Sequence, residues 1–203
     1  MSAVAHLGPG RRSRRELLAA GLVGGSALAS GLFRGGDPAA AGGRSPAQDE
    51  RILNFALGLE YLQAAFYAEA DARGGLAGEL ATFARVVGEQ ERRHVAFLRE
   101  RLGAAARAEP GFDLADVTAD ADSFREAALV LEHQGVAAYV GQGANLSVAG
   151  VAAIAPLVSV EARHAAWILD LAGENPAPAA ADPATTVDGL RAALAEAGLE
   201  LPE

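Results

Sequence analysis

The chain has 203 residues, of which 51% are hydrophobic and 5% aromatic, and its formal net charge is −9. It contains no cysteine, which excludes disulfide bonds, thiolate metal sites and a cysteine nucleophile. The acidic balance argues against a nucleic-acid partner, because no basic patch follows the N-terminal segment. Alanine, leucine, glutamate and arginine favour helices, and long runs of β-branched residues are missing, so the composition predicts an all-α fold.

Residues 1–41 have the pattern of a targeting segment. A run of arginines precedes an apolar stretch, Leu17–Phe33, and small residues follow it, as in a secretory signal. The pair Arg14–Arg15 resembles a twin-arginine (Tat) signal. We expect export through the Tat translocase to the periplasm, the cell wall or the exterior, with cleavage after Ala41. The alternative is a retained membrane anchor, although the stretch is short and glycine-rich for a span.

A linker, residues 42–48, leads into the first of four long predicted helices. Ser45 is its predicted N-cap, followed by a proline at the first helical position and a glutamine two residues later. This helix is expected to run to about Arg73, where two glycines end it. The second helix is predicted from about residue 76 to 106, and an acidic, loop-like connection follows.

The third and fourth predicted helices repeat this layout. Ser123 and Glu126 predict a capping box at the start of the third helix, and Ser147 is the predicted N-cap of the fourth, which ends before Gly173. Residues 174–203 form a tail rich in proline and alanine, with one short helix near its end.

The lengths of the connections predict how these helices pack. Helices of about 25 residues are roughly 37 Å long, and the 15 or so residues after the second helix could reach roughly 50 Å when extended. This connection can therefore cross the bundle, whereas the other two connections are short turns that make antiparallel pairs. The expected core, residues 49–173, is a four-helix bundle of two antiparallel hairpins joined by a long crossover.

The two predicted hairpins carry the same ionisable residues at matching positions. Each has a lone glutamate on its first helix and a Glu-x-x-His pair on its second. The set consists of Glu60, Glu91 and His94 in the first hairpin and of Glu132, Glu161 and His164 in the second. Residues three apart lie on one face of a helix, so each pair can point at one place. Folding the hairpins together brings four carboxylates and two imidazoles into one layer.

Such a layer needs positive charge. An unpaired buried carboxylate is costly and takes up a proton instead, and four carboxylates together would also repel. Two divalent cations would balance four glutamates and leave open positions for water or dioxygen. Oxygen-rich ligands with two imidazoles suit iron or manganese better than structural zinc. One Glu-x-x-His pair alone would be read as a surface pair, so the prediction depends on the repeat.

These six residues resemble the ligands of the di-iron carboxylate proteins in the ferritin-like superfamily. With its signal segment, the chain is similar to exported bacterial ferritin-like domain proteins. The resemblance covers about residues 49–173 and implies a ferritin-like bundle with two iron ions, or manganese in their place. By the same resemblance Glu91 and Glu161 would bridge the ions, and Glu60 and Glu132 would be terminal ligands. A relative that keeps the residues without tight metal binding is the alternative.

Two tyrosines, Tyr67 and Tyr139, lie seven residues after the lone glutamates. Each is expected near the metal layer, either hydrogen-bonded to a ligand carboxylate or packed in the core.

Three functional hypotheses follow. The first is an exported protein that reacts Fe(II) with dioxygen or peroxide, as a ferroxidase-like oxidoreductase or on an organic substrate, and whether it is an enzyme stays open. The second is a non-catalytic structural or binding protein associated with stress or desiccation. The third is a membrane-tethered bundle that binds a partner. A homodimer is compatible with the side-by-side pairing of bundles.

Overall fold

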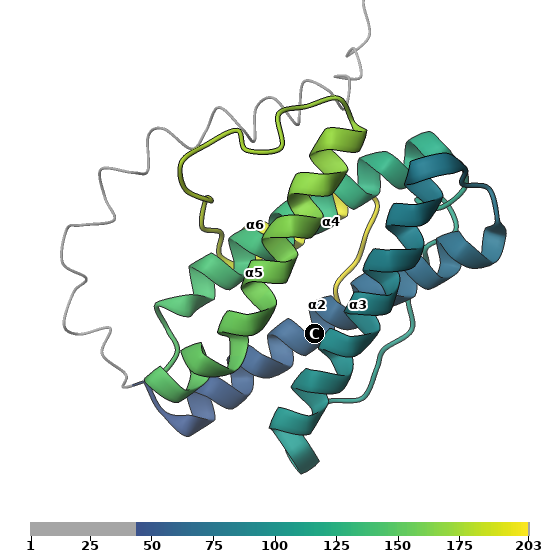
Figure 1. The fold of residues 1–203 in the computed structure, drawn as a ribbon. Helices are drawn as coiled ribbons and strands as arrows, with labels where there is room; N and C mark the ends of the chain where they lie inside the picture. Colours follow the sequence, from purple (N-terminus) through teal and green to yellow (C-terminus); the bar gives the residue numbers. More distant parts are fainter. Residues whose placement is uncertain (1–43, 203) are drawn as a thin grey trace, which may run out of the picture. The chain divides into compact units, whose positions relative to one another are not determined.

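In the computed structural model, the described residues are 44–202, and most of them are helical (Figure 1). The elements are α2 (Pro46–Arg73), α3 (Gly78–Leu102), the 3-10 turn η3 (Gly103–Ala105), α4 (Ala121–Gly143), α5 (Val148–Leu171) and α6 (Val187–Glu196). No strand occurs in this part of the chain, so the predicted all-α fold is confirmed. The predicted signal segment lies outside the described residues.

Serine side chains begin α2 and α5 as the sequence predicts. The hydroxyl of Ser45 accepts a hydrogen bond from the backbone N–H of Gln48 at 3.2 Å. The hydroxyl of Ser147 accepts one from the backbone N–H of Gly150 at 3.1 Å. The first N–H groups of a helix have no partner within it, so such caps fix where each helix starts.

The start of α4 differs from the prediction. Asp120 is the N-cap, and its carboxylate accepts from the backbone N–H groups of Asp122 and Ser123 at 3.0 and 2.8 Å. The predicted capping box at Ser123 is therefore wrong. A carboxylate also interacts favourably with the helix dipole, so the aspartate competes well with the later serine. The helix α3 also ends earlier than predicted, at Leu102.

Short turns join α2 to α3 and α4 to α5, and the residues between η3 and α4 form the crossover (Figure 1). Polar side chains of α2 hydrogen-bond to the start of the crossover and to the turn between α4 and α5. Asn54 accepts from the backbone N–H of Arg107 at 2.9 Å and donates to the carbonyl of Ala105 at 3.0 Å. Asp49 accepts from the backbone N–H of Ser147 at 2.8 Å, which ties the start of α2 to the start of α5. The structure thus confirms the bundle of two hairpins and a crossover.

Apolar side chains form two buried clusters along the bundle. One includes Phe66, Phe83 and Phe124, and the other includes Leu57 and Leu98. Along α3 and α5, the residues of one cluster precede the Glu-x-x-His pair and those of the other follow it. Two apolar layers therefore flank the ionisable residues.

The C-terminal segment completes the first of these clusters. Leu190, Leu194 and Leu199 are fully buried in it, so α6 is part of the core although the sequence places it in a tail. Among the described helices, α5 alone has the length and hydropathy that would suit a membrane span, a property that core helices can share.

Candidate metal centre

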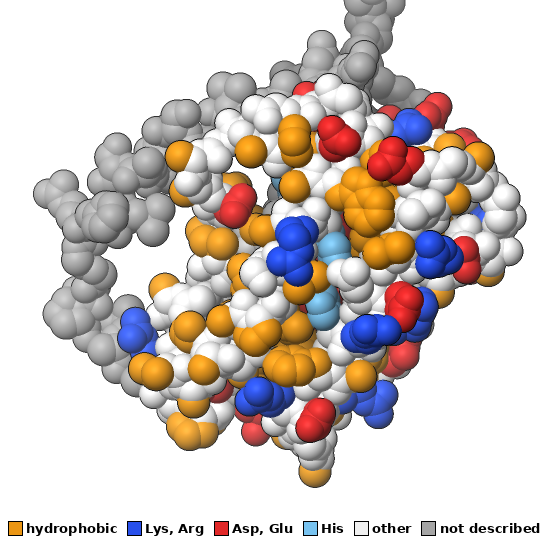
Figure 2. Space-filling model, in the orientation of Figure 1, with side chains coloured by type: hydrophobic (Ala, Val, Ile, Leu, Met, Phe, Trp, Pro, Cys, Tyr) orange, Lys and Arg blue, Asp and Glu red, His pale blue; other side chains and the backbone are white. Residues whose placement is uncertain are grey.

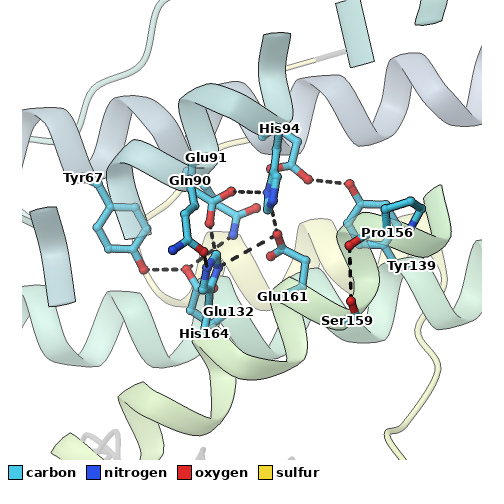
Figure 3. Close-up of polar contacts among 12 residues, drawn as sticks. Tyr67, Gln90, Glu91, His94, Glu132, Tyr139, Pro156, Ser159, Glu161 and His164 are labelled. Carbon is cyan, nitrogen blue, oxygen red and sulfur yellow. Dashed lines mark hydrogen bonds and ion pairs between the residues drawn. The ribbon is translucent and has the colours of Figure 1, made fainter. Parts of the chain in front are cut away.

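The six predicted ligand residues meet in one buried layer between the four long helices (Figure 3). Glu60 comes from α2 and Glu132 from α4, while α3 and α5 each supply a Glu-x-x-His pair. All four glutamates are 0% exposed, and the two histidines are 6% and 3% exposed. The repeat in the sequence is thus a set of neighbours in space.

The ligand atoms form two overlapping groups, and within each group they lie within 4.8 Å of one another. The first group is Glu60, Glu91, His94 and Glu161, and the second is Glu91, Glu132, Glu161 and His164. The two glutamates of the Glu-x-x-His pairs belong to both groups. This sharing is the arrangement that two bridging carboxylates between two ions would need.

The imidazole of His94 faces three carboxylates through one nitrogen. Its Nδ1 lies 2.8 Å from Glu161 Oε1 and 3.1 Å from Glu91 Oε2. The same atom lies 3.4 Å from Glu60 Oε2. A single N–H cannot satisfy three carboxylates, so this position has more acceptors than donors.

The imidazole of His164 is placed in the same way in the second group. Its Nδ1 lies 2.9 Å from Glu91 Oε1 and 3.5 Å from Glu132 Oε2. Its other ring nitrogen, Nε2, lies 2.7 Å from Gln90 Oε1 (Figure 3). Because the amide oxygen accepts a hydrogen bond from Nε2, Nδ1 is left as the nitrogen that can bind a metal ion.

Burial and crowding raise the pKa values of two carboxyl groups. Loss of hydration raises the pKa of Glu60 to about 7, and the negative charge of Glu91 adds to this effect. Loss of hydration likewise raises the pKa of Glu161 to about 7, with Glu60 as the next cause. Burial and mutual repulsion therefore favour the protonated form of these two carboxyl groups when no cation is present.

The histidines respond in the opposite sense. Burial alone would lower the pKa of His94, but its contacts with Glu161 and other carboxylates raise the pKa to about 12. For His164, contacts with Glu132 and neighbouring carboxylates overcome the effect of burial and raise the pKa to about 10. Without other cations, both imidazoles therefore hold a proton that a metal ion would have to displace.

Unsatisfied polar atoms test whether the layer fits metal ions. Among the described residues, eight buried side-chain nitrogen or oxygen atoms have no hydrogen-bond partner, and six of them belong to the predicted ligands. Some of these atoms lie within ion-pair distance of an imidazole but without hydrogen-bond geometry. Buried polar groups are rarely left unpaired in folded proteins. The donor set and its free oxygen atoms therefore fit divalent ions.

The two tyrosines hydrogen-bond across the bundle to Glu60 and Glu132, the two glutamates that belong to one ligand group each and are called the outer glutamates below. Tyr67 on α2 donates to Glu132 Oε1 at 2.5 Å, and Tyr139 on α4 donates to Glu60 Oε1 (Figure 3). Burial and the nearby carboxylates raise the pKa of both hydroxyls well above the usual value, so they remain donors. Both alternatives left open by the sequence are found: each tyrosine donates to a carboxylate of the layer, and each also packs in an apolar cluster.

Two glutamines near the layer were not predicted. Gln63 is fully buried and donates to Glu132 Oε1 at 3.4 Å, and Gln90 contacts His164. The only signal for Gln63 in the sequence is helical spacing, because it follows Glu60 by three residues. His133 lies apart from the layer and contacts the carbonyl of Leu129 through Nδ1 at 2.7 Å.

One face of the molecule carries imidazole side chains at its surface, between arginine and apolar side chains (Figure 2). The two histidines that contact the carboxylates retain small exposed fractions, whereas the glutamates behind them have none. Small molecules would therefore meet the histidine side of the layer first.

The chain was compared with families of known proteins. The family model of the ferritin-like domain matches residues 48–174, which include all four long helices and the six clustered residues. No curated protein is similar enough to the chain to count as a relative.

Proposed function

The chain belongs to the ferritin-like domain family, and from this premise we propose that it binds two iron ions, or manganese in their place, and reacts Fe(II) with dioxygen or peroxide. The observation that carries the proposal is the buried layer in which two overlapping ligand groups contain six polar atoms without hydrogen-bond partners. The net charge of two divalent ions would balance the four carboxylates.

The ligand sets divide between two positions. Glu60 and His94 would hold one ion, Glu132 and His164 the other, and Glu91 and Glu161 would bind both. When bound, the ions supply Lewis acidity and the electrons that reduce the oxidant.

The chain's own residues set up this chemistry in three ways. The hydroxyls of Tyr67 and Tyr139 hold the outer glutamates, which leaves each of these carboxylates a second oxygen for an ion. Gln90 orients the ring of His164 and keeps Nδ1 toward the carboxylates. The apolar clusters on both sides exclude bulk water and strengthen the electrostatic interactions within the layer.

Export is a second part of the proposal. The support is the sequence of residues 1–41, with its paired arginines, apolar stretch and small residues before the expected cleavage site. A Tat translocase carries folded proteins, so a metal-loaded bundle could pass through it into the periplasm, the cell wall or the exterior. N-terminal sequencing of the exported product would show whether cleavage follows Ala41, and a retained segment would favour the membrane-anchored alternative.

Metal analysis tests the proposed centre. We expect the purified protein to take up two Fe(II) ions per chain and to oxidise them in air, followed by near-ultraviolet absorbance. Glu91→Gln should lose at least one ion and most of the oxidation, because this carboxylate belongs to both ligand groups. The matched control is Glu89→Gln, which removes the same charge two residues away, where Glu89 is exposed and paired with Arg93.

Two results would contradict the proposal. One is a wild-type protein that binds no divalent ion, and this result would favour the non-catalytic stress- or desiccation-associated role. The other is equal iron binding by wild type and Glu91→Gln. If iron binds but is not oxidised, the proposed metal centre stands and the proposed redox activity is wrong.

A further inference from the structure

The buried amide of Gln63 has one end unpaired. Its side chain is 0% exposed, its Nε2 donates to Glu132 Oε1 at 3.4 Å, and its Oε1 has no hydrogen-bond partner. A carboxylate oxygen facing a second oxygen would be repelled, so the contact with Glu132 determines which end of the amide is the carbonyl. The carbonyl is therefore a buried acceptor without a donor.

A glycine on the opposite helix, Gly135 of α4, faces this amide at ordinary contact distance. A Cβ atom at Gly135 would lie 3.7 Å from Gln63 Nε2 and 3.8 Å from its Oε1. The same Cβ position is 3.8 Å from Glu161 Oε2. The amide thus lies against Gly135 and contacts Glu132, and Glu161 of the same ligand group lies against the same glycine.

The repeat between the hairpins fails at these positions. The residue three after the lone glutamate is Gln63 in the first hairpin and Gly135 in the second, and the residue before the Glu-x-x-His pair is Gln90 in the first and Val160 in the second. Both glutamines contact the Glu132–His164 side of the layer. The glycine and the valine have no side-chain amide to offer the Glu60–His94 side, so the two ligand groups have different surroundings.

We propose that the Gln63 carbonyl is an additional oxygen donor for the ion held by Glu132 and His164, directly or through a bound water, and that this position is the tighter of the two. The inference rests on the proposed metal centre. Amide oxygens suit hard divalent cations such as Mn²⁺ and Fe²⁺. An ion at this position would satisfy the carbonyl that otherwise has no partner, whereas the Glu60–His94 position gains no such ligand.

Titration of the metal-free, processed protein with Mn²⁺ tests this inference, with free Mn²⁺ measured by electron paramagnetic resonance. We expect wild type to bind two ions with unequal affinities. Gln63→Leu, which has a similar size and no carbonyl, should weaken the tighter site by about tenfold or more and leave the other within about threefold. Gln63→Glu retains an oxygen donor and should keep the two sites unequal.

Controls separate a ligand from a structural role. The metal-free Gln63→Leu protein should unfold within a few degrees of wild type, because the substitution removes an unpaired buried carbonyl together with the long N–H contact to Glu132. The inference would be overturned if Gln63→Leu weakened Mn²⁺ binding equally at both sites, or at neither. In that case, two ions bound to the wild-type protein would still support the proposed function. A wild-type protein that binds no Mn²⁺ would overturn both.

Discussion

Individual side chains in the centre reduce the cost of burying four carboxylates together. Four buried glutamates repel one another, and the raised pKa values of Glu60 and Glu161 show how strongly burial and neighbouring charge act on them. Hydroxyl donors relieve part of this cost at the two outer glutamates, where Tyr67 and Tyr139 each donate one hydrogen bond from the other hairpin. These bonds stabilise the layer and join the two hairpins at its depth.

Removal of one hydroxyl should show what these bonds contribute. Tyr139→Phe leaves a buried carboxylate oxygen without a donor, so the metal-free protein should lose about 2 kcal/mol of unfolding free energy. Tyr61→Phe is the matched control, because Tyr61 is equally buried but donates to a backbone carbonyl, that of Arg107, at 3.2 Å. Its expected loss is about 1 kcal/mol. Urea unfolding measures both, and a larger loss in Tyr61→Phe would contradict this assignment.

The sequence predicts the six clustered residues but not the two glutamines. Glutamates and histidines interrupt apolar helices at spacings that place them on one face, and their repeat in both hairpins makes coincidence improbable. Glutamine is ordinary on a helix surface, so nothing in its type marks Gln63 or Gln90. Only packing shows that Gln63 is fully buried, with its amide facing Gly135 and donating to Glu132.

At the scale of the helices, α2 and α3 approach closely where a glycine faces a tyrosine. A Cβ atom at Gly88 would lie 2.7 Å from Tyr67 Cβ, closer than side chains tolerate. The contact lies one turn before Glu91, so the absence of a side chain at Gly88 lets α3 bring its glutamate to the centre. It also fixes the position from which Tyr67 reaches Glu132.

Gly88→Ala should therefore destabilise the protein despite the better helix propensity of alanine. The two helices must separate, or Tyr67 must shift, at an expected cost of about 1–3 kcal/mol. Gly58→Ala is the matched control within α2, because its Cβ would lie 3.7 Å from Leu201, an ordinary contact. This change should be neutral or stabilising by up to about 1 kcal/mol. Thermal unfolding measures both, and a neutral Gly88→Ala would contradict the close approach.

The sequence predicts the helices from local signals such as capping residues, and it misplaces a helix boundary where several capping residues lie close together. Ser45 and Ser147 are caps in sequence and structure, and each hydroxyl accepts from the backbone N–H three residues later. Before α4 several acceptors lie close together, and Asp120 caps the helix in place of Ser123. The helical pattern near residue 190 predicted α6 but not its burial, since burial depends on which distant surface remains uncovered.

At the scale of the whole molecule, the charged layer divides the apolar core of the bundle. The described helices bury leucine and phenylalanine on both sides of it, and α6 adds Leu190 and Leu194 to one side. This apolar burial must outweigh the cost of the layer when no cation is bound. Stability should therefore depend on everything that changes the charge of the layer, namely protons and metal ions.

The sign of the pH dependence follows from the raised pKa values. Between pH 4.5 and about 7, unfolded chains have lost the protons that Glu60 and Glu161 keep when folded. Above pH 6.5 the same holds for His94 and His164, whose folded pKa values are about 12 and 10. The folded state binds more protons throughout, so stability that is complete below about pH 4.5 is lost as pH rises.

The metal-free protein should accordingly unfold at lower urea concentrations at pH 9 than at pH 5. Glu60→Gln should reduce the slope between pH 5 and 7 because it removes one of the shifted groups, whereas the exposed Glu89→Gln should keep the wild-type slope. Metal ions displace the protons from the same ligands, so the stabilisation by saturating Mn²⁺ should grow with pH over this range. A metal-free midpoint that stays constant or rises from pH 5 to 9 would show that the buried layer does not hold these protons, and that the carboxylates find their positive charge elsewhere in the fold.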